Sequence, residues 1–145
     1  MKLTALIELN QALQSNRVDE VTRVLGREPG MRALAFTPGS SRWTWTPSDE
    51  RARNPFGFLY GGYVAVFVDI LLSSAIGTVL GEGELATTAD LRLEYIRSTP
   101  FALVNGEGRV THKGSRLAFV EAQVVAENGE LLAAGHSTWT VARTN

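Results

Sequence analysis

The sequence contains no cysteine, and this absence removes several kinds of chemistry at once. Disulfide bridges, thiolate metal sites and a cysteine nucleophile are all excluded. Histidine is also scarce, because the chain has only His112 and His136, which lie far apart in the sequence. We therefore predict neither a zinc site nor any other metal or cofactor.

The chain also lacks a long apolar run and a strong charge of one sign. Its most apolar stretch, residues 64–80, is short for a membrane span and contains one charged and several small polar residues. The formal net charge is -1 with scattered charges, so no nucleic-acid partner is expected. Glu8 and Asn10 interrupt any apolar signal core near the N-terminus. We expect a cytoplasmic protein with no membrane partner.

The 145 residues fit one domain, 1–145, with a globular composition of 44% hydrophobic and 20% charged residues. Apolar spacing over residues 3–25 predicts a helical N-terminal extension, 1–27, with a break near Ser15 and Asn16. Two short runs, 31–36 and 41–46, flank a turn and predict a hairpin, followed by a loop over 47–60.

A long apolar helix is predicted over residues 63–80, with Gly61 and Gly62 at its start. Apolar residues occupy nearly every side of this helix, which indicates that other structure wraps it.

Four strands are predicted after the helix, over 86–96, 102–110, 117–126 and 131–141. Short turns separate them at 98–100, 113–115 and 127–129, and the Asn128-Gly129 pair is a strong hairpin signal. Strands joined in this way form an antiparallel meander. An α+β hotdog fold follows, in which the sheet wraps one long central helix. The edge strand and part of the helix stay uncovered, so we expect a homodimer or a dimer-of-dimers tetramer.

Asp69 is the first candidate for chemistry, because it lies inside the apolar run from Val66 to Leu72. Burial of an unpaired carboxylate is costly or raises its pKa, and such acids cluster at active sites. A structural alternative is that Asp69 points to an edge and pairs with an arginine or a backbone donor.

Gly61 and Gly62 lie where the loop meets the helix. Free backbone N–H groups and the positive end of the helix dipole favour an oxyanion or a polarised carbonyl there. Glycine also lets a substrate approach the backbone closely, although a tight helix start would need small residues as well.

The spacing of Gly61 and Asp69 predicts a shared site. Eight residues of helix correspond to roughly 12 Å at about 1.5 Å per residue, too far for one helix to present both groups to one bond. Two antiparallel helices in a dimer can do so, with Asp69 of one copy facing Gly61 of the other.

These residues resemble a known family. Asn54, Gly57, the run Tyr60-Gly61-Gly62 and Asp69 resemble the signature of the phenylacetate-pathway (PaaI-type) branch of hotdog acyl-CoA thioesterases. The resemblance covers about residues 30–143 and continues in three further segments, 87–91, 94–97 and 112–116. The family usually has histidine where this chain has Tyr60.

The resemblance implies roles for several residues. Asp69 would be the general base or nucleophile, and the Gly61 amide would polarise the thioester carbonyl. Asn54 would position the water or the acid, Thr88 would assist the attacking group, and Tyr60 would replace histidine as a hydrogen-bond donor. The substrate would be an acyl-CoA with an aromatic or medium-chain acyl group.

A second group of residues is predicted to bind substrate and coenzyme A. The basic segment around the predicted turn at 113–115 and one arginine are candidates for phosphate contacts, and Gly62 is a candidate for contact with substrate. The full set is Gly62, Arg97, His112, Lys113, Gly114, Ser115 and Arg116.

Two alternatives compete with the thioesterase hypothesis. A hotdog hydratase would use histidine with an acid, and no histidine lies near the start of the helix. A non-catalytic hotdog module that senses acyl-CoA or serves in assembly gains support from Tyr60. Asp69 inside an apolar helix argues against that module, because a pure binder has no need of a charged residue there.

Overall fold

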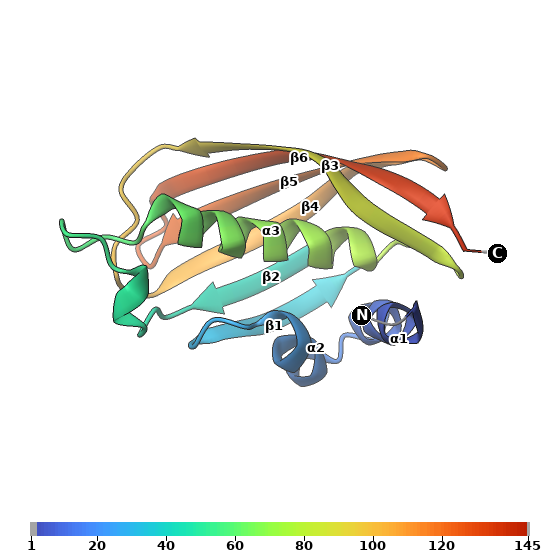
Figure 1. Ribbon diagram of the computed structural model, residues 1–145, viewed down its shortest axis with the longest axis horizontal. Helices are drawn as coiled ribbons and strands as arrows, with labels where there is room; N and C mark the ends of the chain where they lie inside the picture. Colours follow the sequence, from blue (N-terminus) through green and yellow to red (C-terminus); the bar gives the residue numbers. More distant parts are fainter. Residues whose placement is uncertain (1–2, 145) are drawn as a thin grey trace.

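Six antiparallel strands form one sheet, and a long helix, α3, lies across one face of it (Figure 1). The structure is a computed structural model that describes residues 3–144. In chain order the elements are α1 (Leu3–Gln14), α2 (Val18–Leu25), β1 (Met31–Thr37), β2 (Ser40–Trp45), the 3-10 helix η1 (Glu50–Ala52), α3 (Gly61–Gly77), β3 (Glu84–Tyr95), β4 (Val104–Lys113), β5 (Leu117–Ala126) and β6 (Leu131–Arg143).

The N-terminal helical segment is confirmed from Leu3 onward, while residues 1 and 2 of the predicted extension lie outside the described residues. The predicted break separates α1 from α2, and Asn16 adopts a positive φ of 52° there. Asparagine tolerates this conformation better than most residues. Its side-chain oxygen also accepts a hydrogen bond from the Phe36 amide at 2.7 Å, which ties the break to β1.

The order of strands in the sheet is β1-β2-β4-β5-β6-β3, so the predicted four-strand meander is wrong in one connection. β4, β5 and β6 follow one another as neighbours, but β3 pairs with β6. The segment 98–100 is therefore no hairpin turn. It belongs to a connection that crosses the end of the sheet, and β3 becomes an edge strand at the top of Figure 1.

Helix α3 packs closely on the middle of the sheet, mainly on β4, β5 and β2. Glycines at the contact allow this approach, because a Cβ on Gly108 would lie 2.1 Å from the Leu71 carbonyl oxygen and one on Gly106 would meet the Leu71 side chain. The same Leu71 oxygen accepts a hydrogen bond from the Ser41 hydroxyl at 2.7 Å. Phe67 and Leu71 are fully buried as a result.

The C-terminal end of α3 is closed by the N-terminal helix. α3 ends at Gly77, three residues before the predicted limit at residue 80. The Gln14 side-chain amide donates to the Leu80 carbonyl at 2.8 Å and to the Gly77 carbonyl at 3.3 Å. These carbonyls would otherwise lack partners at the helix end. Leu13 lies against Gly77, where a Cβ would come within 2.4 Å of its side chain.

One side of α3 remains open in the single chain, which confirms the prediction that part of the helix and an edge strand stay uncovered. Gly62, Val66 and Asp69 are exposed and share this side, since 3.6 residues per turn bring them into one row. The cause is the position of α3 over the middle strands, which leaves the helix-facing side of the edge strand β3 uncovered. Leu91 on β3 is 36% exposed and Val66 on α3 is 43% exposed.

Candidate active site

The start of α3 presents two backbone donors without protein partners. Tyr60 occupies the N-cap position, but its side chain makes no capping hydrogen bond. Among residues 3–144, no group accepts a hydrogen bond from the amides of Gly61 or Gly62. Together with the positive end of the helix dipole, these amides form a place where negative charge on an oxygen is stabilised.

A cavity of about 390 Å³ opens beside this helix end. It brings together three of the predicted site residues, Asn54, Gly61 and Arg97, from the loop before α3, from α3 itself and from the segment after β3. The remaining lining residues are Phe58, Leu59, Val64, Tyr95, Ile96, Ser98 and Thr99.

Asn54 is held by its own loop. Its side-chain oxygen accepts hydrogen bonds from the amides of Phe56 at 2.9 Å and Phe58 at 3.1 Å. Gly57 completes this turn with a positive φ of 87°, a conformation that favours glycine. Because the oxygen is occupied, the NH₂ group is what Asn54 can offer to a ligand. Asn54 is therefore a hydrogen-bond donor at this site and not an acceptor.

Asp69 lies on the open side of α3, two turns beyond Gly61 in the same uninterrupted helix. No salt bridge or side-chain hydrogen bond engages its carboxylate within the described part of the chain, so the alternative of a structural pair is absent there. The side chain stays accessible, but the surrounding protein partly removes the carboxylate from water, and this desolvation raises the pKa of Asp69 above its ordinary value. A carboxylate of this kind is more basic than a surface aspartate and is suited to accept a proton.

Thr88 lies on β3 and Tyr60 lies at the start of α3, and both side chains are exposed. Thr88 pairs with the buried Trp139 across the sheet, so its side chain is on the helix-facing side of β3, yet it is exposed. A bulge at Ala89 follows it and shifts the register of the strand. Tyr60 is 46% exposed at the N-cap of α3 and does not line the cavity.

The predicted coenzyme A residues around the β4–β5 turn lie at the other end of the molecule. Lys113 donates to the buried carboxylate of Glu84 at 2.7 Å, so its ammonium group is already engaged. The His112 ring packs on Phe119 with a centroid distance of 5.8 Å. Arg116 lines a separate hollow near the end of β6. Gly114 and Ser115 lie in the turn between β4 and β5.

Strand β3 runs between the two ends of helix α3 and shows how far apart they are. Glu84, its first residue, accepts a hydrogen bond from Gly81 just after the C-terminal end of α3. Tyr95, its last residue, donates to Gly61 at the N-terminal end. Within one chain the β4–β5 turn and Gly61 therefore lie about a strand length apart, on the order of 36 Å. Arg97 is the one predicted phosphate partner near Gly61, and it pairs with Glu130 at 2.7 Å.

Two residues of the cavity were missed at the sequence level. Tyr95 donates from its hydroxyl to the Gly61 carbonyl at 2.6 Å. Thr99 is 3% exposed, and its hydroxyl has no hydrogen-bond partner in residues 3–144. Tyr95 could have been found from its place at the end of a strand beside Arg97. Thr99 carried no such signal, because its burial depends on the crossing connection.

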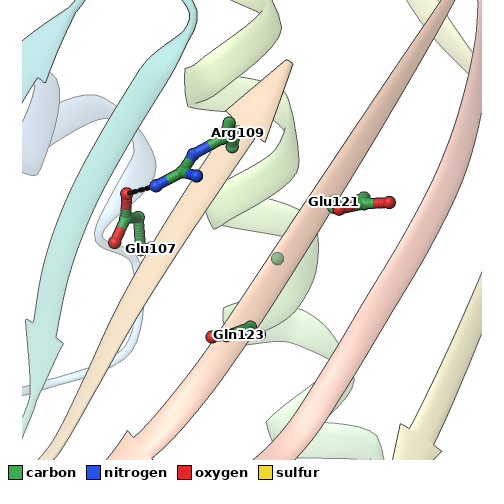
Figure 2. Close-up of a pocket in the computed structure, with 5 residues that line it drawn as sticks. Glu107, Arg109, Glu121 and Gln123 are labelled. Atoms are coloured by element: carbon green, nitrogen blue, oxygen red, sulfur yellow. Dashed lines mark hydrogen bonds and ion pairs between the residues drawn. The ribbon is translucent and has the colours of Figure 1, made fainter. Parts of the chain in front are cut away.

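A second hollow lies on the outer face of the sheet, away from α3 (Figure 2). It is shallow, about 110 Å³, and lies between β4 and β5. Arg109 and Glu107 on β4 pair with each other at 2.9 Å, while Glu121 and Gln123 project from β5. None of the predicted site residues reaches it.

Two kinds of feature are missing from the described residues. No group of three or more histidine, aspartate or glutamate residues among 3–144 could hold a metal ion. In the same range, no helix has the length and apolar character needed to cross a membrane.

Comparison with known proteins decides the family. The family model of the thioesterase superfamily matches residues 56–133, which is more than half of the chain. This chain belongs to the thioesterase superfamily. The matched region includes Gly61, Asp69, Thr88 and Arg97, and Asn54 lies just before it.

Two curated relatives and one solved structure agree with this assignment. The chain is 29% identical to 1,4-dihydroxy-2-naphthoyl-CoA hydrolase of Escherichia coli over 66% of this chain and 70% of that protein. It is 32% identical to the proofreading thioesterase EntH of Klebsiella pneumoniae over 57% of this chain and 61% of that protein. A Haemophilus influenzae thioesterase has the same fold with a TM-score of 0.78 at 20% identity, covering 87% and 90% of the two chains.

Membership in the thioesterase superfamily confirms two predictions. The α+β hotdog fold is present, with a six-stranded antiparallel sheet around a long central helix. The chain is an enzyme of the thioester hydrolase class.

Proposed function

We propose that this thioesterase hydrolyses acyl-CoA thioesters at a site shared between two copies of the chain. The observation that carries the proposal is the pair of free amides at the start of α3, with an unpaired carboxylate farther along the same helix. Thioester hydrolysis needs a donor for the carbonyl oxygen and a base or nucleophile for the acyl carbon.

The reaction follows from these groups. The Gly61 amide donates to the thioester carbonyl oxygen and stabilises the negative charge that develops there. Asp69 takes a proton from water, the water oxygen bonds to the acyl carbon, and the carbon–sulfur bond breaks. The thiolate leaves and gains the proton, which yields a carboxylic acid and free coenzyme A. Direct attack by Asp69, followed by hydrolysis of the anhydride, gives the same products.

Three further residues have supporting roles in this proposal. Asn54 has only its NH₂ group free, so it donates to the carbonyl oxygen or to Asp69. Thr88 lies on the helix-facing side of β3 and assists the attacking water. Tyr60 stands where the family usually has histidine and donates from its hydroxyl, without a positive charge at neutral pH.

A second copy is required because Gly61 and Asp69 are eight residues apart in one helix, roughly 12 Å along its axis. Antiparallel packing of two α3 helices about an axis near Ala65 places Gly61 opposite the partner's Asp69. The exposed side of α3 and the free edge of β3 are the surfaces available for this contact.

The same arrangement accounts for the distant basic residues. If two β3 strands run antiparallel, the Glu84 end of one copy lies beside the Tyr95 end of the other. The turn with His112, Gly114, Ser115 and Arg116 then approaches Arg97 of the partner copy. These residues and Arg97 would bind the phosphates of coenzyme A. Lys113 would not contact the phosphates directly, because its ammonium group is paired with Glu84. It would contribute only to the electrostatic potential around them.

The acyl group is proposed to be aromatic or medium-chain. The Escherichia coli relative, whose name gives a naphthoyl-CoA substrate, favours the aromatic class. Phe58 lines the cavity beside Gly61 and supplies an aromatic wall for such a group. The alternative of a non-catalytic acyl-CoA sensor rests on Tyr60 alone, and the thioesterase family and the hydrolase names of the relatives argue against it.

Release of free thiol from a panel of aromatic and medium-chain acyl-CoAs tests the function. We expect turnover by the wild-type protein and at least a hundredfold slower turnover by Asp69→Ala. Equal rates for the two proteins would refute the role of Asp69. Tight acyl-CoA binding without turnover in the wild type would instead establish the sensor.

Mixing variants tests the shared site. A Gly61→Val variant blocks the carbonyl site in each copy, and Asp69→Asn removes the base. Mixed dimers contain one site with both groups intact, so we expect partial recovery of activity. No recovery in heterodimers verified by native mass spectrometry would rule out sharing.

A further inference from the structure

Tyr95 makes a contact with the start of α3 that the proposed mechanism leaves unexplained. Its hydroxyl donates to the Gly61 carbonyl oxygen at 2.6 Å. Its ring lies over the same residue, because a Cβ added to Gly61 would be only 3.2 Å from the ring carbon that bears the hydroxyl. A side chain from the end of β3 therefore holds the first residue of the helix.

The peptide unit between Gly61 and Gly62 is the part of the site with the most intrinsic freedom. Glycine has the widest range of backbone conformations, and here two glycines adjoin the same peptide. The Tyr60 side chain does not cap the helix, so the usual restraint on a first turn is missing. The Tyr95 hydroxyl adds a side-chain contact to the restraint that helix α3 itself places on this peptide.

Tyr95 supplies that contact through peptide geometry. The Gly61 carbonyl and the Gly62 amide belong to one planar trans peptide and point in opposite directions. A hydrogen bond to the carbonyl oxygen therefore also sets the direction of the Gly62 N–H group, which has no protein acceptor within the described chain. Tyr95 is only partly removed from water, and this desolvation raises the pKa of its hydroxyl above the ordinary value, so the hydroxyl keeps the proton that it donates.

We propose that Tyr95 is a positioning residue that orients the Gly61–Gly62 peptide, so that the Gly62 N–H becomes a second donor to the thioester carbonyl oxygen. This inference rests on the proposed thioester hydrolysis. Tyr95 does not touch the reacting atoms in this role. It restrains the backbone that does, and two aligned donors stabilise the developing charge more than the Gly61 amide alone.

Tyr95→Phe tests the proposal, because it retains the ring and removes only the hydroxyl. We expect kcat for thiol release to fall about tenfold with KM changed less than twofold, since the lost interaction acts on the transition state. The matched control is Tyr63→Phe, which removes a hydroxyl from the same helix that makes no hydrogen bond among residues 3–144. This control should retain wild-type kcat.

A second measurement does not depend on activity. In a ¹⁵N-labelled protein the Gly62 amide should exchange faster with solvent in Tyr95→Phe, and its exchange rate should stay at the wild-type value in Tyr63→Phe. A wild type that hydrolyses no thioester would refute the proposed function, while the Gly62 exchange rate would still decide the restraint. The positioning role is overturned if an active Tyr95→Phe keeps kcat within twofold, or if its Gly62 exchange rate is unchanged.

Discussion

Asp69 and Glu84 are two carboxylates beside the same helix, and their surroundings shift their pKa values in opposite directions. The protein around Asp69 partly removes its carboxylate from water although the side chain stays accessible, and without a charged partner this desolvation raises its pKa. The hydrogen bond from Lys113, helped by the Gly81 amide, lowers the pKa of Glu84. Asp69 is on the open side of α3, whereas Glu84 is 6% exposed at the closed end of the sheet.

The helix ends follow the same division. At the C-terminal end, Gln14 fills the carbonyls of Gly77 and Leu80. At the N-terminal end, the amides of Gly61 and Gly62 have no acceptor in the part of the chain that is described. One end of the molecule has its polar groups satisfied and contributes stability. The other leaves them free, which is what binding and catalysis require.

Asp69→Asn should produce the largest effect, and it should separate activity from stability. We expect thiol release to fall about a thousandfold, because the general base or nucleophile is lost. Stability at pH 7 should rise slightly, since a carboxylate with a raised folded-state pKa destabilises the fold above that pKa. The stability difference from wild type should vanish as the pH falls and Asp69 becomes protonated.

Thermal unfolding at pH 7 and at lower pH values measures this difference. The control is Glu127→Gln, which removes the same charge from an exposed turn. At every pH this control should have nearly the same Tm as the wild type. A lower Tm for Asp69→Asn at pH 7 would mean that Asp69 is a structural residue.

Glu84→Gln should have the opposite pattern, with stability lost and catalysis kept. Removal of one partner of a buried ion pair leaves Lys113 uncompensated, and because the Lys113 side chain is 22% exposed we expect a loss at the lower end for such pairs, about 3 kcal/mol at pH 7. A carboxylate with a lowered folded-state pKa stabilises the fold above its unfolded value of about 4.3. This contribution is lost as the pH falls through the folded-state pKa, so the two proteins should converge in acid.

Urea unfolding at several pH values checks the effect of Glu84→Gln. Glu107→Gln is a matched control, since Glu107 pairs with Arg109 on the surface with 46% and 69% of the side chains exposed. Such a pair contributes about 0 to 1 kcal/mol. A loss for Glu84→Gln no greater than that of the control would show that the buried pair is unimportant.

The open region could largely be predicted from the sequence, because its signals are local. Asp69 stands out as a charge in an apolar run, and Gly61 and Gly62 mark the helix start in consecutive positions. The free helix amides follow from the fact that the first turn of any helix lacks internal acceptors. The distance between Gly61 and Asp69 also comes from helix geometry alone.

The closed end could not be predicted, because its contacts join distant parts of the chain. Lys113 lies in a basic segment, which pointed to phosphate, and only the pairing of the sheet brings it to Glu84. Gln14 reaches a carbonyl 63 residues away. The β3–β6 pairing was missed for the same reason, since short turns in the sequence favour neighbouring strands and a crossing connection has no local signature.

Gly62→Ala should give the smallest effect. It tests whether the N-terminal end of α3 serves catalysis at the expense of stability. A Cβ at Gly62 would meet nothing within 4 Å, so the substitution fits the single chain. Alanine is favoured over glycine in helices by about 0.5 to 1 kcal/mol, and stability should rise by that amount. The same methyl group would stand beside the free amide where the thioester carbonyl approaches, so kcat/KM should fall about tenfold.

Gly61→Ala is the informative counterpart of Gly62→Ala, because it differs by one position in the same turn. Its Cβ would lie 3.1 Å from the Tyr95 hydroxyl, so the neighbouring ring must shift and little stability is gained. Urea unfolding and thiol release, measured on both variants, separate helix propensity from substrate approach. If Gly62→Ala gains stability and keeps full kcat/KM, the thioester carbonyl does not approach the Gly62 amide. The free amides at the start of α3 would then not be explained by catalysis.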